Sequence, residues 1–246
     1  MMKLLAVFFG VAMFVPMAIG QNVNMERYIE LTVRQGERIR LALGSFDKNT
    51  QVRVVSGTYD TTFIANKEWG DEAGENDYHY AQAGTMRIYG DVGYFNCGDN
   101  GINIMALDVS HNIDLSILAC YGSPLPSLDV SKNTSLIVLC CTNNSLTSLD
   151  ISNNTALQVL MCYNNNFTTQ AIDDIYCTLP QRQDNGKAII MPIESSKAPD
   201  YATVMATNKN IATDKNWAVM YSDRTTIPAT GGTYVCGASN NGRVRK

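Results

Sequence analysis

The sequence predicts a solenoid built mainly of β-strands, with little helix, held between two caps. Three observations support this fold class. A frame, Leu-x-x-Leu-x-Cys-x-x-Asn-x-Leu, occurs four times between Val92 and Phe167. A second block, Leu-Asp-Val-Ser-x-Asn, begins at Leu107, at Leu128 and, with Ile in place of Val, at Leu149. These blocks are 21 residues apart both times, so this part of the chain is expected to repeat one coil of that length.

The frame assigns each of its positions to one side of a short strand. Residues two apart point to the same side, so the fourth and sixth positions face the core and the third, fifth and seventh face the other way. The asparagine at the ninth position, replaced by Ser123 in the second copy, is expected to stack from coil to coil. Its amide can bond to backbone groups that a tight turn leaves unpaired. The positions that define the four copies are Val92, Phe95, Cys97, Asn100 and Ile102; Leu115, Leu118, Cys120, Ser123 and Leu125; Leu136, Leu139, Cys141, Asn144 and Leu146; and Leu157, Leu160, Cys162, Asn165 and Phe167.

A frame of this kind with a period of roughly 20 to 29 residues is the leucine-rich-repeat signature. The chain resembles bacterial leucine-rich-repeat proteins, in particular short secreted ones of the Bacteroides group with Leu-Asp-Val-Ser-x-Asn units, and more distantly the internalins. The resemblance covers Val92–Phe167 and, more weakly, Tyr201–Tyr221. It implies an α/β leucine-rich-repeat solenoid of four coils of about 21 residues, over residues 92–168. It also implies that the concave strand face carries the ligand and that the protein acts in adhesion.

The first 20 residues predict a secretory signal peptide. Lys3 precedes an apolar run, and Ala18 and Gly20 are the small residues before a cleavage site. A membrane-spanning helix is the alternative, but the run is shorter than the ~20 apolar residues that a span needs. We therefore expect an exported protein, at the cell surface or secreted, with no membrane span in the mature chain. Without Lys3 that chain has 18 basic and 23 acidic residues, a formal charge of −5, which argues against nucleic acid as a partner.

Residues 21–91 are predicted to form an N-terminal β-rich cap module, because a solenoid exposes its apolar core at each end. The acidic loop Gly70–Asp77 has enough carboxylates for calcium, but it lacks the alternating order of a recognised calcium loop, and this favours a solvated turn. Alternation of apolar and polar residues predicts strands over Tyr28–Val33, Arg38–Leu43, Gln51–Val55, Thr61–Ala65 and Thr85–Tyr89.

Residues 169–237 are predicted to form a C-terminal α+β cap, followed by a flexible tail over 238–246. A helix is expected over Thr169–Leu179, capped by Thr168 or Thr169 and stopped by Pro180. The other expected elements are a helix over Asp200–Asn208 and strands over Ala188–Pro192, Trp217–Tyr221 and Thr233–Cys236.

The seven cysteines fall into three groups. Cys97, Cys120, Cys141 and Cys162 occupy the inward sixth position, where we expect buried free thiols rather than disulfides or a zinc site, because their side chains run along a ladder and do not converge. Cys140 alternates to the outer face and is the candidate reactive thiol. Cys177 and Cys236 lie outside the repeats, and a disulfide between them is one alternative in an exported protein.

Nothing in the sequence predicts an enzyme, a cofactor or a metal site. The chain has two histidines, and His111 occupies a block position that is Lys132 and Asn153 elsewhere, as expected for a solvent position. No nucleophile elbow, His-Glu-x-x-His motif or phosphate-binding glycine loop is present in the sequence.

The outward strand positions are unusually apolar for a surface exposed to solvent, and this predicts a contact surface. Four strands of five residues give a face of only roughly 300 Å², below the ~800 Å² per partner of a standard interface, so the caps must widen the footprint or the ligand must be small. The candidate ligand-binding residues at the third, fifth and seventh positions are Tyr94, Ile117, Ala119, Tyr121, Val138, Cys140, Thr142, Val159, Met161 and Tyr163.

The function expected from these features is an exported, non-enzymatic protein-interaction module that binds a protein or host-surface component through the concave strand face. A glycan-binding accessory protein is the first alternative, with Tyr121 and Tyr163 presenting their rings to a sugar chain. A structural envelope component that forms homodimers is the second.

Overall fold

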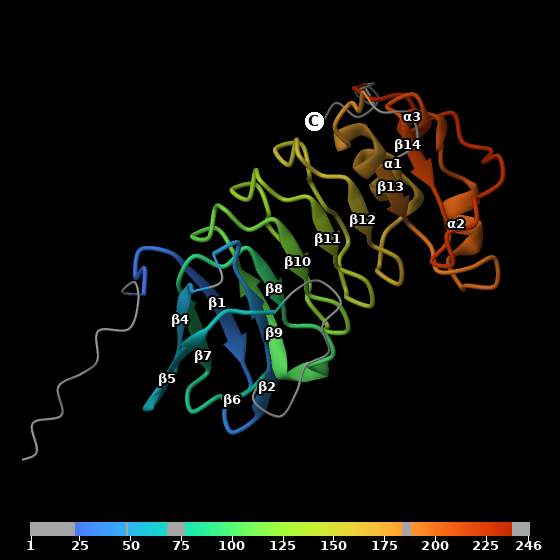
Figure 1. The fold of residues 1–246 in the computed structure, drawn as a ribbon. Helices are drawn as coiled ribbons and strands as arrows, with labels where there is room; N and C mark the ends of the chain where they lie inside the picture. Colours follow the sequence, from blue (N-terminus) through green and yellow to red (C-terminus); the bar gives the residue numbers. More distant parts are fainter. Residues whose placement is uncertain (1–22, 48, 68–76, 184–187, 238–246) are drawn as a thin grey trace, which may run out of the picture.

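The computed structural model describes residues 23–47, 49–67, 77–183 and 188–237. These residues form an elongated, mostly β molecule with few and short helices (Figure 1). The predicted signal peptide, most of the acidic loop and the predicted tail lie outside the described residues. In the part of the chain that is described, no helix has the length and apolar character needed to cross a membrane.

The central element is a seven-stranded sheet in which six strands run parallel, in the order β14-β13-β12-β11-β10-β8. The third frame positions pair directly, Ile117 with Val138 and Val138 with Val159, so equivalent residues form straight rows. The last two strands lie where the sequence predicts cap strands, and they extend these rows beyond the repeats. The parallel strands are β8 (Tyr94–Asn96), β10 (Ile117–Ala119), β11 (Val138–Cys140), β12 (Val159–Met161), β13 (Ala188–Met191) and β14 (Trp217–Val219).

Apolar columns fill the space behind the sheet. Leu118, Leu139 and Leu160 at the fourth position are completely buried, and Ile190 of β13 continues their row. The thiols of the sixth position are also buried, and desolvation raises the pKa of Cys97 and of Cys162 to about 12. These four cysteines are free thiols in the structure. They are therefore small apolar side chains of the core.

Two rows of buried asparagines hold the turns between strands. At the ninth position, the amide nitrogen of Asn144 donates to the carbonyls of Cys120 and Cys141, at 2.9 and 3.1 Å. The half-buried Asn165 makes the equivalent bonds to the carbonyls of Cys141 and Cys162. Asn100 bonds to the carbonyl of Cys97 and to that of Arg40 in the N-terminal module. The second row is the last residue of the Leu-Asp-Val-Ser-x-Asn block: Asn154 donates to the carbonyls of Val130 and Asn133, at 2.9 and 2.8 Å. Asn144, Asn154 and Asn165 thus tie their own repeat to the preceding one, and Asn100 ties the first repeat to the N-terminal module.

The eighth frame position has a left-handed backbone in every copy, a feature that was not predicted from the sequence. Its φ is 56° at Asp99, 69° at Gly122, 54° at Asn143 and 55° at Asn164. Gly, Asn and Asp are the residues that adopt this conformation most readily. The turn after each strand therefore selects these residue types, whatever they contact.

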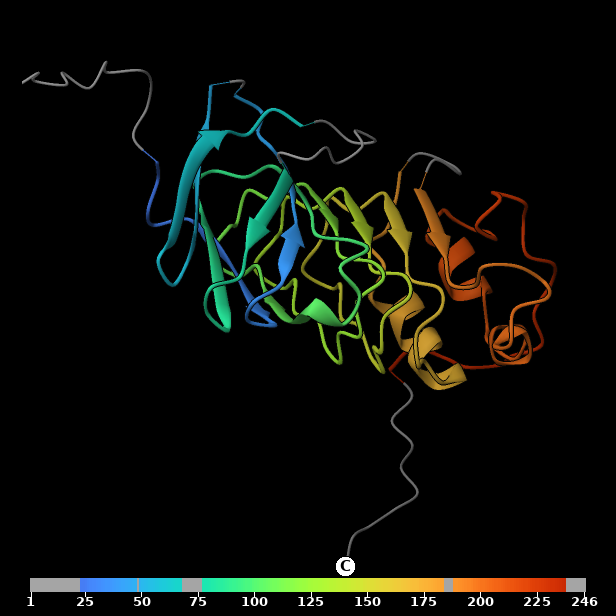
Figure 2. The same cartoon turned by 90° about the horizontal axis from the view of Figure 1, so that it is seen from below.

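A five-stranded antiparallel sheet covers the N-terminal end, in the order β5-β4-β7-β1-β9 (Figure 2). Its edge strand, β9 (Ile104–Asp108), comes from the first coil, after the 3-10 turn η2 (Gly101–Asn103), and pairs with β1. The first repeat therefore supplies a strand to the cap. The other strands are β1 (Tyr28–Val33), β4 (Gln51–Ser56), β5 (Tyr59–Ile64) and β7 (Thr85–Tyr89).

The single strand predicted over Arg38–Leu43 is two strands in the structure. β2 (Arg38–Arg40) pairs with β6 (Tyr78–Tyr80), a strand that was not predicted from the sequence. β3 (Ala42–Gly44) pairs antiparallel with β8 and covers the edge of the parallel sheet. The split falls at Leu41, whose backbone N–H bonds to the carbonyl of Asp77 at 2.8 Å.

In the described part of the C-terminal region, three short helices pack beside one another. α1 (Thr169–Thr178) is capped by the Thr168 side chain, which accepts from the backbone N–H of Ala171 at 3.1 Å, as predicted. α2 (Tyr201–Met205) falls within the predicted helix, and α3 (Asn210–Thr213) was not predicted.

The strand predicted over Thr233–Cys236 is absent from the structure. A disulfide joins Cys177 to Cys236 and draws this segment along α1. There, the Tyr234 hydroxyl donates to Asp174 at 2.8 Å, and the Tyr234 carbonyl accepts from the Asn208 side chain at 2.9 Å. The backbone is thus bonded to side chains rather than to a neighbouring strand.

Candidate functional site

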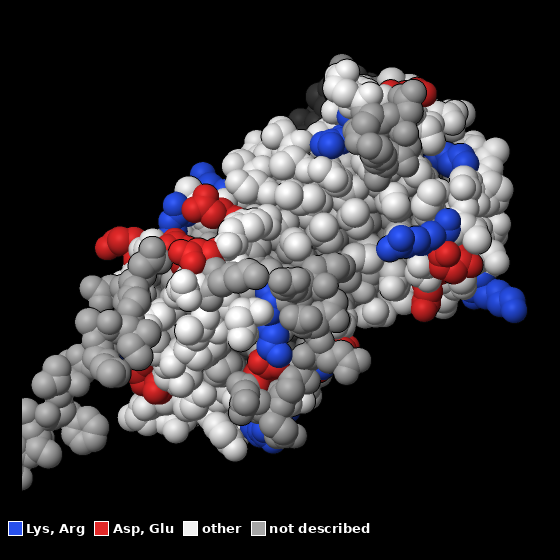
Figure 3. All heavy atoms as spheres, in the orientation of Figure 1, with Lys and Arg blue, Asp and Glu red and all other residues white. Residues whose placement is uncertain are grey.

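The candidate functional site is the outward side of the six parallel strands, which we call the ladder face. Its longest row follows the third frame position, where Ile117, Val138 and Val159 are half-buried. Ile189 of β13 and Ala218 of β14 continue that row in register. Met161, with Met220 just beyond β14, is half-buried on the same side. Figure 3 shows a broad surface without Lys, Arg, Asp or Glu over the middle of the parallel sheet.

Four of the ten predicted ligand-binding residues are buried, which corrects their assignment as contact residues. Tyr94 is 6%, Ala119 1%, Cys140 8% and Thr142 3% exposed. Strands in a sheet lie about 4.8 Å apart, so longer neighbours on both sides cover a short side chain such as alanine or threonine. The Tyr94 ring is long, but it lies at the N-terminal end of the sheet, and its hydroxyl accepts from the Asn96 side chain at 3.2 Å.

Six of the predicted residues are half-buried, and they keep part of their surface available for contact: Ile117, Tyr121, Val138, Val159, Met161 and Tyr163. The Tyr121 ring lies across Gly98, where a Cβ atom would be 2.5 Å from the ring carbons. Gly98 therefore leaves the space in which this ring lies flat. Tyr163 is two coils away, and partial burial raises the pKa of its hydroxyl.

Cys140 is not the reactive thiol that its outward position suggests. Its sulfur lies 3.8 Å from the Thr142 hydroxyl, and burial raises the pKa of the thiol. A thiol with a raised pKa forms little of the nucleophilic thiolate at neutral pH. Cys140 is therefore part of the apolar ladder face.

A polar rim borders the ladder face at the carboxyl ends of the strands, and it consists of Arg40, Asp99, Asn143, Asn164 and Glu194. Arg40 forms an ion pair with Asp99 at 3.1 Å. The Asn164 amide donates to Asn143 at 3.0 Å and to Glu194 at 3.1 Å. An apolar centre beside a polar rim is the usual anatomy of a protein interface.

Sequence reasoning missed the part of the ladder face that β13 and β14 contribute. Ile189, Ala218 and Met220 are outward and half-buried, but the frame is absent from their segments. The short apolar runs Ala188–Met191 and Trp217–Met220 were the available signal. With six strands instead of four, the same spacing gives a face of roughly 480 Å².

Outside the ladder face, the structure places the two histidines of the sequence in separate surroundings. Within the described ranges, no three His, Cys, Asp or Glu residues are grouped in a way that could hold a metal ion. His111 is stacked on Tyr28, with ring centroids 4.2 Å apart, and is half exposed. His79 is buried in the N-terminal module.

Comparison with known proteins gives one structural likeness. No protein-family model and no curated protein matches the chain. A solved structure that matches is the functional domain of InlJ from Listeria monocytogenes, described as including a cysteine ladder, with 20% sequence identity and a TM-score of 0.32. The match covers 52% of this chain and 36% of that one, so this chain spans about a third of the length of that structure.

Proposed function

We propose that this chain is an exported protein-interaction module without enzymatic activity, a leucine-rich-repeat solenoid with four sequence repeats that binds a protein at the cell surface. The single observation that carries this proposal is the ladder face, a contiguous apolar surface with little charge on a sheet whose rows are in register. The largest apolar patch on the surface of a protein is often a functional contact site. The Leu-Asp-Val-Ser-x-Asn units, which resemble those of short secreted Bacteroides-group proteins, support the same function.

Export is supported by the disulfide between Cys177 and Cys236, because disulfides persist in oxidising compartments. The apolar N-terminal run is the sequence feature that would direct the export. We also propose an adhesion role at the cell surface, which the resemblance of the repeat frame to the internalins implies.

The size of the ladder face limits how the partner binds. A face of roughly 480 Å² is smaller than the ~800 Å² that a standard interface buries on each partner. We expect the partner to place an apolar side of its own on the ladder face and to reach the polar rim with hydrogen-bonding groups. The affinity is expected to depend on a few residues near the centre, such as Met161 and Tyr163.

The experiment that tests this proposal measures binding of the purified protein to a panel of extracellular-matrix and cell-surface proteins. The test variant combines Tyr121→Ala, Met161→Ala and Tyr163→Ala. A matched control is Met105→Ala, which removes a methionine that is 45% exposed on β9, outside the ladder face. A partner that the triple variant loses and the control keeps would support the proposal.

Two other results would contradict it. If a partner binds the triple variant as tightly as the unmodified protein, the contact lies on the caps and not on the ladder face. If no protein of the panel binds and the protein is a dimer in light scattering that the triple variant converts to a monomer, the ladder face joins two copies of this chain. The second result would support a structural role.

A further inference from the structure

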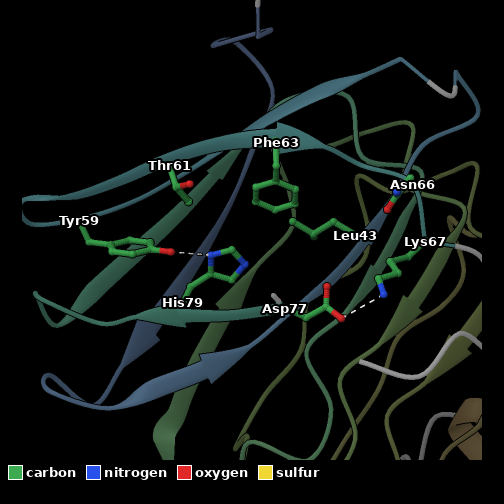
Figure 4. Close-up of a pocket in the computed structure, with 8 residues that line it drawn as sticks. All are labelled: Leu43, Tyr59, Thr61, Phe63, Asn66, Lys67, Asp77 and His79. Carbon is green, nitrogen blue, oxygen red and sulfur yellow. Dashed lines mark hydrogen bonds and ion pairs between the residues drawn. The ribbon is translucent and has the colours of Figure 1, made fainter. Parts of the chain in front are cut away.

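The N-terminal module contains a cavity of about 350 Å³ that is separate from the ladder face (Figure 4). Tyr59, Thr61 and Phe63 of β5 line one wall, because alternate residues of a strand point to the same side. All three are half-buried. Its volume lies at the lower end of the range of about 300 to 1,000 Å³ that is usual for small-molecule sites.

One wall of the cavity is aromatic, and its rings contact one another. The His79 ring is stacked on Phe63, with centroids 5.4 Å apart, and lies edge-on to Tyr59 at 6.0 Å. Nδ1 of His79 is 3.1 Å from the Tyr59 hydroxyl, as the dashed line in Figure 4 marks. His79 is only 2% exposed, so it acts as a positioning residue that fixes the direction of this hydroxyl at the cavity wall.

The other end of the cavity is polar but carries no net charge. Lys67 and Asp77 form an ion pair at 3.1 Å, and both are among the lining residues. Asn66 lies beside them and adds an amide that can donate and accept. Burial lowers the pKa of His79 to about 4, so its ring is neutral at physiological pH. Nothing in this set favours a ligand with a net positive or negative charge.

We propose that this cavity is a binding site for a small, uncharged, hydroxyl-bearing ligand with an apolar face, of the size and chemistry of one pyranose sugar ring. The C–H face of such a ring packs against aromatic side chains, which here are Tyr59 and Phe63. Its hydroxyl groups can donate to and accept from the hydroxyls of Tyr59 and Thr61, the Asn66 amide and the Lys67–Asp77 pair. The site is distinct from the glycan alternative on the ladder face, because it involves neither Tyr121 nor Tyr163.

The test titrates the purified protein with a panel of neutral monosaccharides and disaccharides and follows binding by NMR, including the His79 and Tyr59 ring signals. The test variants are Thr61→Val and Tyr59→Phe, which remove one hydroxyl each and keep the shape of the side chain. Loss of one hydrogen bond is expected to weaken binding about threefold to tenfold. The matched control is Thr62→Val, the same change at the adjacent, exposed position of β5.

The expected result is that one or more sugars bind, shift the His79 and Tyr59 signals and bind more weakly to both test variants but not to the control. The ladder-face triple variant is expected to bind the sugar as the unmodified protein does, so this test fails or succeeds independently of the proposed protein partner.

Absence of binding across the panel would overturn the proposal. Binding that Thr61→Val and Tyr59→Phe leave unchanged would overturn it as well, because the sugar would then bind elsewhere. Melting temperatures within about 2 °C of the unmodified protein would show that the variants are folded.

Discussion

At the residue scale, the left-handed turn at the eighth frame position explains which residue types occur there. Their contacts alone do not explain this. Gly122 has a φ of 69°, and a Cβ atom there would meet the Asp99 carboxylate at 3.1 Å. Ser and Thr are also small and polar, but Gly, Asn and Asp adopt this backbone more readily. The signal for this turn was present in the sequence, since the four residues are Asp, Gly, Asn and Asn.

We expect Gly122→Ala to lower the free energy of unfolding by about 1 to 2 kcal/mol, because an L-residue is strained at positive φ. Asn143→Gly, at the equivalent turn of the next coil, is expected to change it little. Urea unfolding of the two variants beside the unmodified protein measures both effects. An unchanged midpoint for Gly122→Ala would contradict the assigned backbone.

The second prediction at this scale concerns the pH dependence that His79 confers. Burial lowers its pKa from 6.5 to about 4 in the folded protein, so between these values the unfolded chain binds a proton that the folded chain does not. The stability that His79 contributes is therefore complete above about pH 6.5 and falls as the pH falls towards 4, by up to about 3 kcal/mol. Urea unfolding at pH 7 and pH 5 should show this loss in the unmodified protein, and a much smaller loss in His79→Gln. Equal losses in the two proteins would assign the titration to other groups.

At the element scale, the buried asparagine rows join consecutive coils, and adjacent residues provide a direct test. Asn154 is completely buried and bonds to two carbonyls of the preceding coil, whereas Asn153 beside it is exposed. We expect Asn154→Ala to destabilise the protein by about 2 to 4 kcal/mol, because it removes two hydrogen bonds to the preceding repeat and opens a cavity. Asn153→Ala should have little effect. Thermal unfolding of this pair gives the comparison, and similar shifts for both variants would argue against the inter-coil role.

The strands and helices show how far sequence patterns predict elements. The four repeat strands and α1 follow from local signals: a frame that fixes which side each residue faces, and a threonine cap. β6 and α3 were not predicted because each is very short, three and four residues, and carries little periodicity. The segment Thr233–Cys236 has the composition of a strand, but the disulfide at Cys236 and the bond from Asn208 to Tyr234 hold it elsewhere. In this segment, tertiary contacts therefore override the local preference for a strand.

The candidate site was predictable only in part, for the same reason. The frame correctly separates inward from outward residues, but exposure depends on the neighbouring side chains, and the frame does not describe these. Ala119 and Thr142 point outward and are nevertheless buried. Ile189 and Ala218 join the ladder face through strand pairing that links segments without repeat similarity. The cavity beside His79 likewise combines residues from separate strands.

At the scale of the whole molecule, the cysteines predict a labelling pattern that tests the core and the C-terminal cap together. The described chain has one disulfide, across 59 residues, and five free, buried thiols. Burial raises the pKa of Cys120 and Cys141 well above its usual value. We expect a thiol-alkylating reagent to leave the native protein almost unmodified and to add five groups after denaturation without reductant. Mass spectrometry counts the groups, and rapid labelling of the native protein would contradict the buried thiol column.

The same disulfide is expected to stabilise the C-terminal region. Closing a loop of this length restricts the unfolded chain, and its loss is expected to cost about 2 to 4 kcal/mol. The double variant Cys177→Ser, Cys236→Ser should unfold at lower urea than the unmodified protein, whereas Cys140→Ser should leave the disulfide intact. Equal midpoints for the double variant and the unmodified protein would show that the bond does not contribute to stability.

The in-register rows make the length of the molecule adjustable in discrete steps. Each parallel strand pairs only with the strands before and after it, and β3 covers the first strand of the parallel set. Duplicating the 21-residue segment from Leu136 to Ala156 would insert one strand and move the two ends apart by about 4.8 Å, without altering either end. Each such duplication would enlarge the outward surface by roughly 80 Å². Variation in repeat number is therefore a simple route by which a protein of this design could match partners of different size.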